Sequence, residues 1–179
     1  MKNMNRFLLI LFSIIAFSSC KMADFDRYPG ESLDQYPESI WGYHESRFAF
    51  GTEGDDIPAG ATINKDTAIL TNLVREKETD FTLSDSVVFS KYKKLHFISF
   101  RSISEEKGLH WNVFPVMIDS DAFSVYHFYI NDDAAEELKS LLEPVAEGSK
   151  VLKMNEKAYY KFCKKWLPQL EPQIFERTK

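Results

Sequence analysis

LHFISFR (residues 95–101), WNVFPVMI (residues 111–118) and FSVYHFYI (residues 123–130) are three runs rich in β-branched and aromatic residues, and they decide the fold of this chain. The segments between them are short and polar, as tight turns are. Such runs joined by short turns predict an antiparallel β-meander. Apolar residues occupy both faces of these strands, as Phe97 and Ile98 do. We therefore expect the sheet to be covered twice, either by curling into a half-barrel or by helices.

Two helices are predicted after the meander. The first starts near Asp133 in a capping-box-like sequence and ends near Pro144. The second has Asn155 as its predicted N-cap and ends before Pro168. Val151-Leu152, between them, is predicted as a short edge strand. The apolar stripe of the first helix consists of Ala134, Leu138, Leu141, Leu142 and Val145.

The predicted fold is α+β: a twisted antiparallel β-meander or half-barrel with two C-terminal helices. A length of 179 residues favours one domain, which we place at residues 40–168. Within it, strands are also predicted in 40–50, 67–74 and 86–89 and a loop at 51–60, while 79–85 is ambiguous. Residues 20–39 contain two prolines among acidic residues and are interpreted as a tether, and residues 169–179 as a loose tail.

The charge balance bears on the class of partner. The chain has 22 Lys and Arg against 27 Asp and Glu, a net charge of -5. Nucleic-acid binding needs basic residues clustered on one face, so this balance argues against a nucleic-acid partner. Two cysteines are too few for a disulfide-rich scaffold.

Export is predicted from the first 19 residues. Lys2 and Arg6 precede an apolar run from Phe7 to Ile15, extended by Ala16 and Phe17, in which Ser13 is the single polar residue. As a helix this run would span about 16 Å, roughly half of the hydrocarbon core of a bilayer. It also lacks the polar face that a core helix would show. A basic start, a short apolar run and then small residues are typical of a removable export signal.

Phe17-Ser18-Ser19-Cys20 follows the apolar run and resembles the lipobox of bacterial lipoproteins, in which leucine, two small residues and cysteine precede lipid attachment and cleavage. Phe17 stands where leucine is usual. The resemblance implies a signal peptide at residues 1–19 and fatty-acyl chains such as palmitate on Cys20. These chains would anchor the protein to the cell membrane or the outer membrane, facing the periplasm or the cell surface.

Further segments resemble lipoproteins of the Bacteroidetes group. Lys21 followed by Asp24 and Asp26 is similar to the signals of their surface-exported members. LSDSVV (residues 83–88) and WNV (residues 111–113) add a likeness to uncharacterised proteins of this type. The resemblance implies no activity and no cofactor.

Cys163 is predicted to be a buried structural thiol. Tyr159, Phe162, Cys163 and Trp166 follow the spacing of one helix face. A free cysteine on an apolar face behaves as a small hydrophobic residue. A catalytic thiolate would instead need an exposed, electropositive setting and a histidine partner.

The histidines do not predict a metal site. If the turns centre near 104–105 and 120, His96 lies beside Val113, and Val113 beside His127. The two histidines are then two strands apart, about 9–10 Å. One zinc ion with Zn–N distances of about 2.0–2.1 Å cannot bind both.

No catalytic residue and no cofactor are predicted, and we expect the chain not to be an enzyme. Acidic pairs such as Asp55-Asp56 are adjacent in sequence, so their side chains diverge. The Glu53–Asp56 loop lacks the regular acidic repeat of a calcium loop. Sequence motifs of hydrolases, metalloproteases and nucleotide sites are absent.

The aromatic content of the chain is unusually high, with fifteen Phe, eight Tyr and three Trp. Strands favour aromatic residues, so most are expected in the core; Trp41 and Trp111 are the candidates for a ligand pocket or an interface. The leading hypothesis is a non-catalytic, membrane-anchored lipoprotein that binds a partner protein or a cell-envelope component. One alternative is a carrier of a small apolar ligand in an aromatic-lined half-barrel. Another is a periplasmic inhibitor or immunity-type protein.

Overall fold

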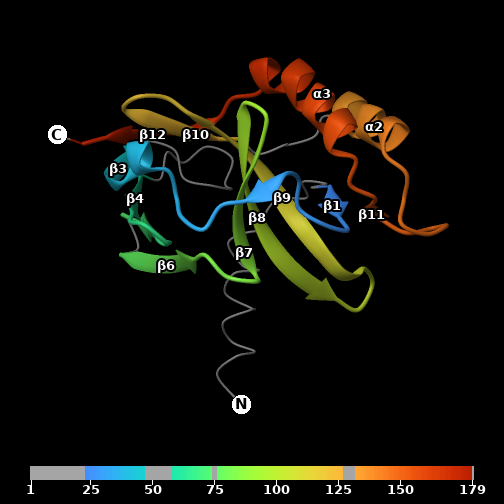
Figure 1. Cartoon of the computed structure of the whole chain (residues 1–179), viewed down its shortest axis with the longest axis horizontal. Coiled ribbons are helices and arrows are strands. Elements are labelled where there is room, and N and C mark those ends of the chain that lie inside the picture. Colours follow the sequence, from blue (N-terminus) through green and yellow to red (C-terminus); the bar gives the residue numbers. More distant parts are fainter. Residues whose placement is uncertain (1–22, 47–57, 74–75, 127–131, 179) are drawn as a thin grey trace, which may run out of the picture.

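The predicted fold class is confirmed. The computed structural model describes residues 23–46, 58–73, 76–126 and 132–178. These residues form an α+β fold in which mostly antiparallel strands curl into a half-barrel, with two helices near the C-terminus (Figure 1). Along the sheet the strands follow the order β2-β7-β8-β9-β10-β12-β3-β4-β5-β6, and β1 lies between β9 and β11.

Each predicted strand of the meander is present, and the surrounding strands are short. The strands are β1 (Asp24–Phe25), β2 (Glu31–Ser32), β3 (Gly42–Ser46), β4 (Ala59–Ile63), β5 (Thr67–Asn72), β6 (Lys77–Thr82), β7 (Val87–Tyr92), β8 (Leu95–Ser104), β9 (Gly108–Ile118), β10 (Ala122–Val125), β11 (Val151–Leu152) and β12 (Gln173–Arg177). The last part of the third predicted run, residues 127–130, lies outside the described residues.

The hairpin β8–β9 joins the two longest described strands of the sheet, of 10 and 11 residues. Its register runs from His96 opposite Val116 to Ser104 opposite Gly108. Gly108 closes the turn with φ +65°, a left-handed conformation that costs glycine little. The turn therefore centres on Glu106. This position determines which residues of β8 and β9 lie opposite one another.

The two faces of this hairpin are covered by different parts of the molecule. Odd-numbered residues such as Phe97 and Val113 pack in a cluster with the two helices. Even-numbered residues such as Ile98 and Val116 face a second cluster, formed where β4, β5, β10 and β12 curl over the sheet. The sheet is therefore covered on both sides, as its sequence predicted: the helices cover one face, and the curled part of the sheet covers the other.

Within the described residues, two α-helices and two 3₁₀ turns accompany the sheet. Asn155 caps α3 by accepting a hydrogen bond from the Ala158 backbone N–H at 3.1 Å, as predicted. Figure 1 shows α2 and α3 together at one end of the molecule, remote from β3 and β4. The helical segments are η1 (Glu38–Ile40), α2 (Asp132–Leu141), α3 (Glu156–Trp166) and η2 (Leu167–Gln169).

The apolar stripe predicted for the first helix is only partly correct. Ala134, Leu138 and Leu142 are buried, at 2% exposure each. Leu141 and Val145 are 42% and 46% exposed. The helix ends at Leu141, so Val145 no longer follows its periodicity.

The predicted tether and tail differ from the structure. Phe25, within the supposed tether, is 1% exposed and packs 4.9 Å from the ring of Tyr159. Tyr36 is 2% exposed and packs against Phe89. At the other end, β12 pairs with both β10 and β3. Both segments belong to the domain because they complete its sheet and its two cores.

Candidate functional site

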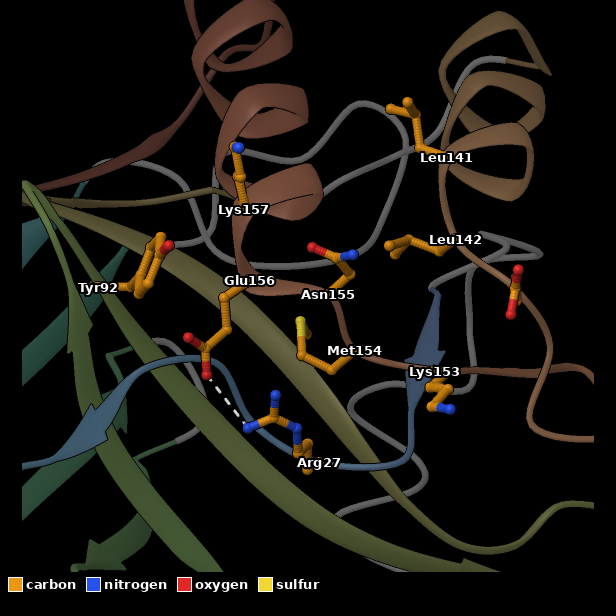
Figure 2. A pocket seen from close by; sticks show the side chains of 10 residues that line it. Arg27, Tyr92, Leu141, Leu142, Lys153, Met154, Asn155, Glu156 and Lys157 are labelled. Carbon is orange, nitrogen blue, oxygen red and sulfur yellow. Dashed lines mark hydrogen bonds and ion pairs between the residues drawn. The ribbon is translucent and has the colours of Figure 1, made fainter.

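A hollow of about 530 Å³ lies where the start of the domain meets its helices (Figure 2). Four separate segments meet there: the chain after β1, the end of β7, the end of α2, and the connection from β11 into α3. The lining residues are Arg27, Tyr92, Leu141, Leu142, Glu143, Lys153, Met154, Asn155, Glu156 and Lys157.

Polar contacts hold the walls of this hollow together. Nη1 of Arg27 donates to Oε1 of Glu156 at 3.1 Å, and Figure 2 shows the two side chains pointing toward one another. The same Glu156 oxygen accepts the Gly30 N–H at 3.3 Å. Asp26 accepts the backbone N–H of Met154 at 2.7 Å. These bonds tie the segment after β1 to the start of α3, so the hollow has a defined shape.

The chemistry of the hollow suits contact with a polar or anionic group. Lys153 and Lys157 add two cations to the guanidinium of Arg27, against the carboxylates of Glu143 and Glu156. Apolar surface comes mainly from the α2 end and Met154. The sequence does not reveal this hollow, because its residues come from four segments with no common spacing.

A second polar cluster lies beside β1. Asp24 is 4% exposed, and its carboxylate forms an ion pair with Nζ of Lys107. Nε2 of His110 lies 3.6 Å from the other carboxylate oxygen, and Nδ1 of His110 lies 3.0 Å from the Gly108 carbonyl. A buried carboxylate needs such partners. This cluster fixes the first strand to the end of the β8–β9 hairpin.

Trp41 and Trp111, the two aromatic candidates, are not brought together. Trp111 is 8% exposed, belongs to the helix-covered cluster and meets the Tyr28 ring edge-on at 5.1 Å. Trp41 packs against the other cluster and donates its indole N–H to the Tyr36 carbonyl at 2.9 Å. Neither lines the hollow. Both side chains are used in packing.

The predicted relation of His96 to its neighbours is wrong in register. His96 lies opposite Val116, and Val113 lies opposite Ser99. His127 and the Glu53–Asp56 loop lie outside the described residues. Within residues 23–46, 58–73, 76–126 and 132–178, no three His, Cys, Asp or Glu side chains are grouped so that they could hold a metal ion.

His44 is a buried histidine whose environment the sequence did not reveal. It is fully buried, and its Nε2 donates to the Ile40 carbonyl at 3.0 Å. Desolvation lowers its pKa, with a further lowering from Arg177, although the bond to Ile40 acts in the opposite direction. The ring is therefore neutral and packs edge-on against Phe123 at 5.1 Å.

Cys163 lies in the helix-covered core with no exposed surface, as its spacing predicted. Burial raises the pKa of its thiol well above the usual range. Burial likewise raises the pKa of Tyr159 beside it. These groups stay protonated at neutral pH, which suits packing and does not suit nucleophilic chemistry.

Cys20, the predicted lipidation site, lies outside the described residues. Within those residues no helix combines the length and the apolar character needed to cross a bilayer. Comparison with models of protein families, with curated proteins and with solved structures gave no match to this chain.

Proposed function

We propose that this protein is exported, anchored by lipid on Cys20, and binds a partner protein or a cell-envelope component without catalysing a reaction. The observation that carries the proposal is the Phe17-Ser18-Ser19-Cys20 sequence, directly after a short apolar run and four residues before β1. The acyl chains would keep the protein at a membrane, because more than one chain makes such anchoring stable.

Binding without catalysis is supported by how the reactive side chains are used. The Cys163 thiol and the His44 ring are both fully buried, and burial shifts each pKa toward the uncharged form. Uncharged, inaccessible groups serve packing and do not reach a substrate.

A surface contact is favoured over the carriage of an apolar ligand. Aromatic side chains of the curled sheet pack on one another, as the rings of Phe123 and Phe175 do at 4.8 Å, and both are at most 5% exposed. The hollow near α3 has Tyr92 as its single aromatic lining residue and several charged ones. It is better suited to polar groups of a partner than to an apolar molecule.

Anchoring is tested by the intact mass of the protein purified from membranes. The expected mass is that of residues 20–179 plus the acyl groups, and a Cys20→Ala variant should leave the membrane fraction. An unmodified Cys20 in the mature protein would contradict the proposal.

Partner binding at the hollow is tested by charge reversal. Lys157→Glu in the lipidated protein should lose a partner cross-linked in intact cells, while Lys77→Glu on β6, also exposed, should retain it. Equal cross-linking by both variants would place the contact elsewhere. A small apolar molecule retained in native mass spectrometry would instead favour the carrier.

A further inference from the structure

A row of lysines follows the exposed face of α3, next to the hollow. Lys157, Lys161 and Lys164 have the spacing of one helix face, and all three are exposed. Seven residues of helix separate the first from the last, a rise of about 10.5 Å. We call these three residues the lysine row. Lys157 also lines the hollow, so the hollow and the row form one continuous surface.

Lys93, in the turn between β7 and β8, extends this surface. Its Nζ lies 4.9 Å from the centre of the Tyr160 ring and 5.5 Å from the centre of the Tyr92 ring. The two rings pack edge-on, with their centroids 5.8 Å apart. Cation–π contacts of this kind hold an ammonium group in place without removing its charge. Because Tyr92 also lines the hollow, Lys93 lies at the edge of the hollow.

The positive charge of this surface is not balanced within the part of the chain that the structure describes. Neither Lys93 nor any lysine of the row forms an ion pair with a described carboxylate. The chain as a whole has a net charge of -5, so the excess of positive charge is local. A local excess of one sign attracts a partner of the opposite sign.

The hollow offers hydrogen-bond acceptors as well as cations, which narrows the class of partner. Lys153 and Lys157 lie on different sides of it in the view of Figure 2, and the carboxylates of Glu143 and Glu156 line it too. A polymer of phosphates supplies only acceptors and would be repelled by these carboxylates. A polypeptide with acidic side chains supplies carboxylates for the lysines and backbone N–H groups for Glu143.

The concave shape of the hollow favours the same class of partner. Its volume is about 530 Å³, and it lies between the end of α2 and the start of α3. A flat membrane surface could touch the lysine row but could not enter the hollow. An extended chain can lie along the row and place side chains in the hollow, where Leu141, 42% exposed, offers apolar contact.

We propose that the hollow, the lysine row and Lys93 together bind an acidic, extended segment of a partner protein. Carboxylates of the segment pair with the lysines, and its backbone N–H groups reach Glu143. The inference rests on the partner binding proposed above and deepens it by naming the chemistry of the partner. Charge pairs at an exposed surface chiefly raise the rate of association and make binding depend on salt.

The test measures the binding of a fluorescent synthetic peptide of alternating glutamate and serine to the full-length lipidated protein in micelles of a neutral detergent, by fluorescence anisotropy. A control peptide carries glutamine in place of every glutamate. We expect only the acidic peptide to bind. Its affinity should fall several-fold as the ionic strength rises from about 0.1 M to about 1 M, because the Debye length then shortens from about 10 Å to about 3 Å.

Two double variants locate the contact. Lys157→Gln, Lys161→Gln removes two charges beside the hollow and should weaken binding of the acidic peptide several-fold. Lys65→Gln, Lys77→Gln removes the same charge from two exposed positions next to β5 and β6 and should bind as the unsubstituted protein does. Lysine and glutamine have similar helix propensities, so α3 should fold in the first variant, which circular dichroism checks. Equal weakening in both variants would mean that binding follows net charge alone and would overturn the inference.

Three other outcomes would also overturn the inference. Tighter binding of inorganic polyphosphate than of the acidic peptide assigns the surface to a phosphate polymer. Protection of Lys157 and Lys161 from acetylation in phosphatidylglycerol vesicles, but not in phosphatidylcholine vesicles, assigns it to an anionic membrane. If the acidic peptide does not bind although Lys157→Glu still loses its cross-linked partner, the partner is not acidic and only the proposed function stands. If Lys157→Glu keeps that partner, the contact at the hollow is rejected as well.

Discussion

Nε2 of His110 lies 3.6 Å from Oδ1 of Asp24, and the two side chains are 7% and 5% exposed. The same carboxylate pairs with Lys107, so Asp24 is held by two residues at the end of the β8–β9 hairpin. A buried carboxylate stays in place only when its charge and hydrogen bonds are satisfied. The contact makes the chain from Asp24 onward part of the sheet.

Asp24→Asn should therefore destabilise the whole domain. The amide cannot compensate Lys107, so we expect a loss of about 1–3 kcal/mol in the free energy of unfolding, measured in urea. Glu106→Gln, which removes the exposed partner of Lys150, is the matched control and should have no measurable effect. Equal stability of the two variants would show that residues near Asp24 behave as a tether after all.

Cys163 should be protected from thiol reagents in the folded protein. Its side chain is fully buried and burial raises its pKa, so reaction requires unfolding. We expect Ellman's reagent to react at least about 10³-fold more slowly than in urea, the folded-to-unfolded ratio of a stable domain. The lipidated protein should then show one thiol in urea, and its Cys163→Ser variant none. Rapid reaction of the folded protein would place the thiol at the surface.

Strands β8 and β9 could be predicted because their composition and length are unusual. The runs around Phe97 and Val113 are long, aromatic and bounded by polar turns, so local pattern was sufficient. Strand β1 could not be found in this way, because it has two residues and the prolines around it are also typical of a tether. Phe25 is buried by strands β9 and β11, which are remote in sequence.

The error in the hairpin register has a local cause. A turn centred between Ser104 and Glu105 would place His96 opposite Val113, while the observed centre at Glu106 places it opposite Val116. Shifting a turn by one and a half residues moves every partner by three. Gly108, with its positive φ, was the residue that could have located the turn.

Trp111→Ala should unfold or strongly destabilise the protein. The ring is 8% exposed and packs with Tyr28, so its loss opens a cavity in the helix-covered core and costs about 3–5 kcal/mol. Trp41→Phe should cost only about 1 kcal/mol, because it keeps most of the apolar contact and loses the hydrogen bond to Tyr36. Urea unfolding of both variants checks this order. Unchanged stability of Trp111→Ala, with loss of a bound small molecule, would support the carrier.

The stability of the domain should fall as the pH falls from 7.5 to 5.5. Desolvation lowers the pKa of His44, and both burial and Lys91 lower that of His96, below the ordinary value of 6.5. Below about pH 6.5 the unfolded chain therefore binds more protons than the folded chain. The contribution of the two histidines to the free energy of unfolding is fully present above about pH 6.5 and is lost as the pH falls below it. Each ring can contribute less than about 1.4 kcal/mol per pH unit. The lowered pKa values of Glu106 and Glu137 act below 4.5, outside this range.

The His44→Gln, His96→Gln double variant separates this effect from other titrations. Its amide at position 44 keeps a donor for the Ile40 carbonyl, and neither glutamine titrates. Urea midpoints measured across the same pH range should change less in the double variant than in the unsubstituted protein. An equal slope in both proteins would mean that another group, with a different position in the fold, controls the response to acid.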